Sequence, residues 1–167
     1  LAEAGDLRVA SFNVLNFFTT VVGGDANPTG SNRGALTVPE FELQRTKIVS
    51  AITRLNADVV GLMEIENNGY GDNSAIANLV EALNAAQPDE ADHYRWIASP
   101  DGQPIGTDAI TVGLIYRPAS VTPQGAASLI VLPVQQAEAV DASGKPVAIN
   151  QGMRESLLQQ FSSPKGD

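Results

Sequence analysis

The chain is organised around the stretch NADVVGLMEIENNGY, residues Asn56–Tyr70. Within it, the apolar run Val59–Met63 has the length and the β-branched start of a buried strand. The run ends abruptly at Glu64, so a carboxylate is expected where a core strand ends. Loops converge at the carboxyl ends of strands in an α/β sheet, and ligands bind there. Glu64 is therefore the first functional candidate, and a solvated carboxylate at a strand end is the alternative.

The composition predicts one globular unit. The chain has 167 residues, of which 43% are hydrophobic, enough for one buried core and too little for two. Its net charge of −9 argues against a broad basic surface for nucleic acid or anionic lipid. A metal-dependent enzyme is still compatible with that charge, because a bound cation inverts the local sign where a phosphate lands. There is no cysteine, and no apolar run approaches the roughly 20 residues that span a bilayer.

The first part of the chain alternates between strand and helix patterns. Leu7–Asn13 alternates as a strand does, Pro39–Asn56 carries apolar residues at helical spacing, and Val59–Met63 is the next strand. This order predicts a βαβ unit, whose two strands are parallel and end at the same edge of the sheet. Asn13 and Glu64 are thus expected to lie close together, although they are far apart in the sequence.

A long loop is predicted between the first strand and the first helix. The segment Val21–Leu36 is rich in Gly, Asn and Pro, and a loop of that length in a compact domain is commonly functional or mobile. Arg33 lies within it, and an ordinary solvated side chain is the expected role. Glu66, beyond the second strand, is expected to be solvated or to act behind a metal ligand rather than as one.

The rest of the chain predicts one further helix and several short strands. Asp72 or Asn73 is expected to cap the helix, which would end near Ala86. Strands are predicted at Tyr94–Ala98, Ala109–Tyr116 and Ser128–Leu132. The segment Val134–Gly152 is mostly small and polar, and the local periodicity of Met153–Phe161 favours a helix over a strand. The single histidine, His93, is expected to be a surface or packing residue.

Four segments resemble the endonuclease/exonuclease/phosphatase superfamily, which has the deoxyribonuclease-I-like fold. They are SFNVLNFF (Ser11–Phe18), EFELQRTKIVSAI (Glu40–Ile52), ADVVGLMEIEN (Ala57–Asn67) and DAITVGLIYRPASV (Asp108–Val121). The combination is most similar to the large secreted bacterial extracellular nucleases of that superfamily. The resemblance implies an α/β (α+β) fold that forms the N-terminal half of a four-layer α/β/β/α sandwich.

The resemblance also implies roles for individual residues. Asn13 matches a strand-end asparagine that helps to hold phosphate and metal, and Glu64 matches a metal-binding glutamate. Asp108 is similar in placement to a catalytic acidic residue that orients a histidine. Arg154 resembles an arginine, at the start of a strand, that contacts substrate phosphate, which would make the segment after it a strand rather than a helix. Asn16 is a further candidate for contact with phosphate or DNA.

The function implied is that of a divalent-metal-dependent phosphodiester hydrolase, first of all an extracellular DNA endonuclease that uses Mg²⁺, or Mn²⁺ or Ca²⁺. The superfamily's second half, with its catalytic histidine and Asp/Asn pair, does not occur in this sequence. Residues 1–167 are therefore expected to be one partial domain that is inactive alone. The start without an initiator Met fits a processed or excised piece, and the resemblance implies a secreted bacterial protein. Alternatives are a phosphatase or lipid phosphodiesterase of the same superfamily, or a non-catalytic half-domain. The expected partner is DNA or another phosphodiester, and the sequence indicates no oligomeric state.

Overall fold

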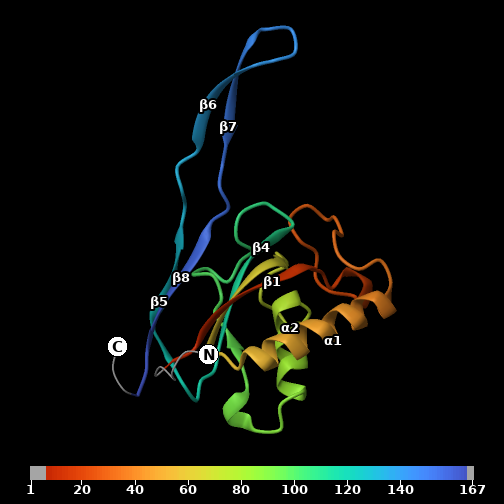
Figure 1. Cartoon of the computed structure of the whole chain (residues 1–167), viewed down its shortest axis with the longest axis vertical. Coiled ribbons are helices and arrows are strands. Elements are labelled where there is room, and N and C mark those ends of the chain that lie inside the picture. Colours follow the sequence, from red (N-terminus) through yellow and green to blue (C-terminus); the bar gives the residue numbers. More distant parts are fainter. Residues whose placement is uncertain (1–6, 165–167) are drawn as a thin grey trace.

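The computed structural model describes residues 7–164, and their fold is mixed α/β. Two helices, α1 (Val38–Leu55) and α2 (Ala75–Ala85), lie on one face of a four-stranded sheet (Figure 1). The strand order in this sheet is β1-β2-β4-β3. The bounds of these strands are β1 Val9–Phe17, β2 Val59–Glu66, β3 Arg95–Trp96 and β4 Ile110–Tyr116. Short 3₁₀ turns occur at Thr20–Val22 and Glu90–Asp92.

The pairing of the sheet confirms the predicted βαβ unit. β1 and β2 are parallel neighbours with α1 between them in the chain, and Val9 pairs with Val59. β4 then runs antiparallel to β2, and β3 runs antiparallel to β4. Both β1 and β2 extend past the predicted ends, Asn13 and Met63. Asn13, Asn16 and Glu64 therefore lie within the strands rather than after them.

The bounds of α1 follow from local chemistry. Thr37 accepts a hydrogen bond from the backbone N–H of Glu40, and the Glu40 side chain accepts from the N–H of Thr37, which forms a capping box. Asn56 ends the helix in the left-handed conformation. The predicted helix Pro39–Asn56 is therefore correct to within one residue at each end. For α2 the predicted cap is wrong, because Ser74 caps it by accepting from the N–H of Ala77.

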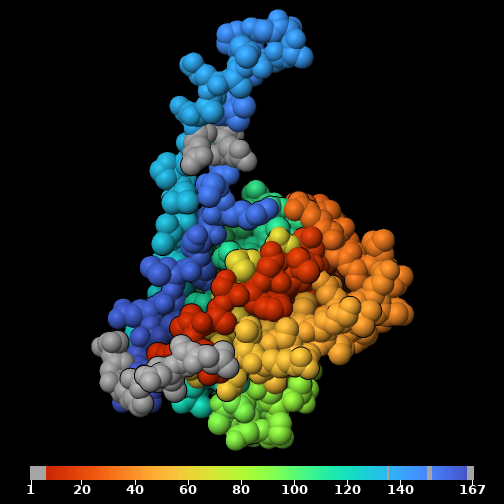
Figure 2. Space-filling view, viewed as in Figure 1, coloured from red at the N-terminus to blue at the C-terminus, as the bar shows by residue number. Residues whose placement is uncertain are grey.

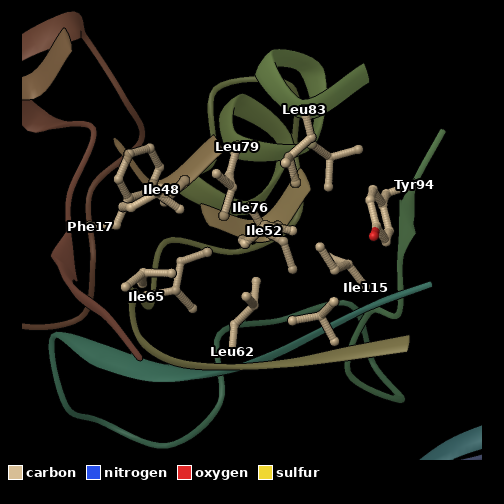
Figure 3. Close-up of a cluster of buried hydrophobic side chains, with 14 of the residues drawn as sticks. Phe17, Ile48, Ile52, Leu62, Ile65, Ile76, Leu79, Leu83, Tyr94 and Ile115 are labelled. Atoms are coloured by element: carbon tan, nitrogen blue, oxygen red, sulfur yellow. The ribbon is translucent and has the colours of Figure 1, made fainter. Parts of the chain in front are cut away.

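The core lies between the two helices and the sheet. Ile52 of α1 and Leu79 of α2 point toward Leu62 of β2, and all three side chains are buried (Figure 3). These helical residues belong to the 3.6-residue apolar pattern, whereas Leu62 belongs to the alternating pattern of the strand. The hydrophobic periodicity of the sequence is thus sufficient to predict which faces meet.

A long two-stranded ribbon follows β4. Its lower part pairs β5 (Thr122–Ile130) with β8 (Ser156–Ser162), and its upper part pairs β6 (Gln135–Val140) with β7 (Pro146–Gln151). The upper part projects away from the body of the protein (Figure 1). β6 and β7 lie in the small, polar segment Val134–Gly152, and their described side chains are exposed or half-buried, so burial gives this hairpin no strong apolar pattern in the sequence. In the described part of the chain, neither helix is long and apolar enough to cross a membrane.

The helix favoured for Met153–Phe161 is wrong, since this segment contains strand β8. Leu157 and Phe161 are four residues apart, a spacing that fits one side of a helix and equally one side of a strand. In the structure they pack beside Tyr116 of β4, with the Phe161 and Tyr116 ring centroids 5.4 Å apart. Pairing with β5 decides between the two conformations. The strand expected at Ser128–Leu132 begins earlier, as β5.

Removal of core volume tests the packing of helices on sheet. Leu62→Ala is expected to lower the free energy of unfolding by about 2–5 kcal/mol, because the side chain is buried and leaves a cavity. Urea denaturation measures this change. The control Leu43→Ala removes the same atoms from an exposed site on α1 and is expected to change stability by less than about 0.5 kcal/mol. Equal effects of the two variants would contradict the assigned core.

Candidate functional site

The two parallel strands become irregular at the same level. Asn13 still pairs with Met63, but the next paired residues are Phe17 and Ile65. In between, Leu15, Asn16 and Glu64 adopt left-handed backbone angles, with φ of 55°, 53° and 61°. Such angles cost about 1–3 kcal/mol at residues other than glycine and persist only where surrounding contacts impose them. Adjacent bulges therefore present Asn13, Asn16 and Glu64 at one edge of the sheet.

The bulge in β1 is held by two side chains. Gln44 of α1 donates from its Nε2 to the carbonyl oxygens of Val14 and Leu15, at 3.1 and 2.8 Å. The Oδ1 of Asn13 accepts from the N–H of Leu15 at 2.8 Å. These bonds satisfy backbone groups that the interrupted ladder leaves unpaired. The sequence does not predict this role of Gln44, because no pattern in a helix distinguishes a solvated glutamine from one that binds a neighbouring strand.

The two glutamates of the MEIE segment have different surroundings. Glu66 is buried, with 3% of its surface exposed. Its carboxylate accepts from the N–H of Thr19 at 2.8 Å, from the Nδ2 of Asn27 at 2.8 Å and from the Nδ2 of Asn68 at 3.1 Å. Glu64 is half-buried, and within the described part of the chain its carboxylate makes no hydrogen bond or ion pair. Glu66 is thus a structural residue, whereas the oxygens of Glu64 are free to bind a ligand.

The next two residues, Asn67 and Asn68, each hold a different loop. Asn67 donates to the carbonyl oxygens of Ile105 and Asp108, at 2.7 and 2.9 Å, and accepts from the N–H of Ile105. Asn68 donates to the carbonyl oxygen of Asp25 at 3.0 Å and accepts from the N–H of Ala75, the first residue of α2. The segment that carries Glu64 therefore also positions both loops beside it.

A cluster of three charged residues lies at this end of the sheet. The Nη2 of Arg33 lies 2.8 Å from one carboxylate oxygen of Asp108, and the Nε of Arg154 lies 3.0 Å from the other. Arg33 is exposed, as the sequence predicts, and in addition it forms an ion pair with Asp108. Asp108 and Arg154 are in contact, although the sequence analysis assigned them separate roles.

The arginines change the acidity of Asp108. Partial burial by itself raises the pKa of this carboxyl group. Hydrogen bonds from Arg154 and from the N–H of Ala109, together with the charges of both arginines, outweigh burial and hold the pKa below its ordinary value. Beside the cluster is a cavity of about 310 Å³, whose lining includes Thr107, Thr111, Met153 and Glu155. The aspartate is therefore ionised when the arginines meet a ligand near neutral pH.

The donor set at the bulges fits a weakly held hard cation. Among residues 7–164, no group of three or more His, Asp and Glu side chains is arranged to enclose a metal ion. Mg²⁺ is usually held by one or two carboxylates together with water and substrate phosphates, so the free carboxylate of Glu64 beside Asn13 fits it. His93 lies elsewhere, with its Nε2 3.0 Å from the carbonyl oxygen of Gln87.

No model of a protein family and no curated protein sequence matches this chain. A fold supports many activities, so an assignment of function has to come from the chemistry of a site. The bulged edge with Asn13 and Glu64, and the neighbouring cluster around Asp108, are the arrangement of polar groups from which that chemistry can be derived.

Two matched substitutions test the different surroundings of the glutamates. Glu66→Gln is expected to lower the free energy of unfolding by about 1–3 kcal/mol, because an amide group cannot accept all the hydrogen bonds that reach the carboxylate. Glu64→Gln makes the same chemical change without loss of an internal bond and is expected to leave stability unchanged. Chemical denaturation of both variants measures the difference. A larger loss for Glu64→Gln would contradict the assignment.

The lowered pKa of Asp108 predicts how its ion pairs respond to acid. Since the folded-state pKa lies below the unfolded value, the contribution to stability is present above the ordinary pKa of 3.8 and is lost as the pH falls through the lowered one. Carboxyl ¹³C NMR is expected to give a midpoint below 3.8 for Asp108. Arg154→Ala is expected to raise that midpoint. A midpoint that Arg154→Ala leaves unchanged would show that the arginine does not stabilise the carboxylate.

Proposed function

We propose that this protein is a divalent-metal-dependent phosphodiester hydrolase, and specifically a secreted DNA endonuclease. One observation carries the proposal: Glu64, a carboxylate without an internal partner among the described residues, lies beside Asn13 where two parallel strands bulge together. The resemblance of Ala57–Asn67 to the deoxyribonuclease-I-like superfamily supports the same site. On this proposal, the mixed sheet with its two helices is the N-terminal half of a four-layer sandwich.

Glu64 is proposed to hold Mg²⁺, or Mn²⁺ or Ca²⁺, through its carboxylate oxygens. When bound, the ion neutralises charge that develops on the phosphate during hydrolysis. Two observations support this role. The backbone of Glu64 is left-handed where the strand pairing is interrupted, and its side chain has no hydrogen-bonded partner among the described residues. Glu66 is excluded as a ligand by the hydrogen bonds that occupy its carboxylate.

Asn13 is proposed to orient the substrate phosphate. Its Oδ1 accepts from the N–H of Leu15, so its Nδ2 group is the part of the amide left to donate to a phosphate oxygen. A neutral amide donates without adding negative charge to a site that has to receive an anion. The oxygen retains a second lone pair, which is available to a metal-bound water. Asn16, on the same bulge, is proposed to donate to the nucleic acid in the same way.

Arg154 is proposed to bind a phosphate of the substrate. Its side chain is exposed and uses Nε to bind Asp108, which leaves the two Nη groups to donate outward. Asp108 is proposed to act in catalysis by positioning this arginine, because its carboxylate bonds hold the guanidinium in place beside the cavity. This local positive group offsets the net charge of −9 where an anionic substrate would approach.

Glu64→Gln in the complete protein tests the proposal. Plasmid nicking in Mg²⁺ is expected to fall by about 100-fold or more, since one interaction that stabilises developing charge is worth about that much. Chelation with EDTA is expected to have the same effect on the natural protein. The control Glu81→Gln removes an exposed charge from α2 and is expected to retain full activity.

The assay also separates the alternatives. If the natural protein nicks no plasmid DNA but releases phosphate from inositol phosphates in Mg²⁺, the substrate assignment is wrong and a phosphatase is supported. If neither substrate is turned over, and calorimetry detects no Mg²⁺ binding that depends on Glu64, the chain is a non-catalytic module. Cleavage by Glu64→Gln at the natural rate would overturn the metal assignment.

A further inference from the structure

We propose that Arg33 is a second phosphate-binding residue, which pairs with Arg154 across Asp108 to hold a backbone phosphate of a nucleic acid strand. This inference rests on the proposed function, since it names a substrate contact of the same site. It starts from an unusual local charge balance. One carboxylate is shared by two guanidinium groups, so these three side chains together carry one positive charge in a chain whose net charge is −9, and the carboxylate of Glu155 also lines the cavity beside them.

The arginines retain donors for a ligand. The side chains of Arg33 and Arg154 are 44% and 60% exposed, whereas that of Asp108 is 31% exposed. Within the described part of the chain, the side chain of Arg33 binds Asp108 through Nη2 and that of Arg154 through Nε, so most of their N–H groups remain available to a ligand. Guanidinium groups bind phosphate through pairs of parallel hydrogen bonds. An exposed ion pair contributes only about 0–1 kcal/mol to stability, so folding alone gives little reason for this cluster.

The backbone beside Arg33 is fixed against the end of β1. A Cβ atom on Gly34 would lie 2.7 Å from the carbonyl oxygen of Asn16 and 2.7 Å from the Cβ of Phe18, so only glycine fits there. Asn32 accepts from the N–H of Gly34 at 2.9 Å and donates to the carbonyl oxygen of Ala35. Figure 2 shows this orange segment beside the red surface of β1. Arg33 is therefore held at the edge of the sheet.

Asp108 is fixed just as firmly from the other side. Asn67 binds its carbonyl oxygen at 2.9 Å, and its own Oδ1 accepts from the N–H of Ala109 at 2.7 Å. A rigid carboxylate between two arginines holds both guanidinium groups before substrate arrives, which reduces the side-chain entropy lost on binding. The arrangement has the features of a preorganised anion site.

The sheet register indicates which phosphate this site would bind. Glu66 pairs with Ile110, and the two strands are antiparallel. Asp108 comes two residues before Ile110, beyond the end of the paired region, whereas Glu64 comes two residues before Glu66, within the sheet. The arginine pair and Glu64 are therefore offset along the strand direction. Successive phosphates of a nucleic acid chain can occupy both points, whereas a small monoester has one phosphate, so the offset favours a nucleic acid.

Binding of a duplex DNA oligonucleotide to the complete protein in EDTA tests the role of Arg33. Arg33→Gln is expected to weaken binding to duplexes of any sequence and to reduce the slope of log Kobs against log salt by about 0.9, the value for one phosphate contact. Arg33→Lys is expected to retain the salt slope but to bind DNA more weakly, because lysine keeps the charge and cannot make two parallel hydrogen bonds to one phosphate. In Mg²⁺, Arg33→Gln is expected to raise KM more than it lowers kcat.

The matched control is Arg95→Gln, which removes one exposed positive charge from the edge strand β3. If Arg33→Gln and Arg95→Gln have the same affinity and salt slope, the proposal for Arg33 is overturned, while Glu64-dependent cleavage by the natural protein would leave the proposed function intact. If the natural protein neither binds nor cleaves DNA, both fail. If Arg33→Gln is unfolded in a thermal melt, Arg33→Lys decides: a natural affinity and slope for this variant would contradict the paired-arginine site.

Discussion

Hydrogen bonds to the buried carboxylate of Glu66 join the segments around the candidate site. A buried ionised group is costly unless hydrogen bonds satisfy it, and here donors from Thr19, Asn27 and Asn68 do so. Two of these donors belong to the long loop after β1, so the requirement of one carboxylate fixes that loop on the sheet. Arg33, farther along the same loop, therefore has a defined position beside Asp108.

The bulge in β2 places Glu64 and Glu66 in different surroundings, although they are only two residues apart. In a regular strand, residues two apart point to the same face, so Glu64 and Glu66 would share one environment. The left-handed backbone at Glu64 breaks that alternation, and Glu66 turns into the interior while Glu64 remains half-buried and unpartnered among the described residues. The matching bulge in β1, held by Gln44, brings Asn13 to the same level. Backbone strain thus accompanies the candidate site, as it does at many functional sites.

Charge is distributed unevenly over this acidic molecule. Two arginines share Asp108 at the end of the sheet toward which β2 runs, and the carboxylate of Glu64, unpaired within residues 7–164, lies further back along β2. That combination is compatible with an anionic substrate approached from one side and a cation held on the other. The side chains that build it come from a loop, a segment before β4 and a segment before β8. Glu66 holds the loop through Asn27, and Asn67 holds the segment before β4.

Apolar periodicity, helix-start residues and strand order are local signals, so they are sufficient to predict the βαβ unit, α1 to within one residue and the position of Asn13 beside the end of β2. The strand conformation of the segment before Phe161 depends instead on tertiary pairing, since its apolar spacing fits a helix or a strand and β5 supplies the partner. The tertiary structure also decided that Glu66 is buried and that Arg33 reaches Asp108. These contacts join hydrogen-bond donors and charges that are far apart in the sequence, so no local sequence pattern predicts them.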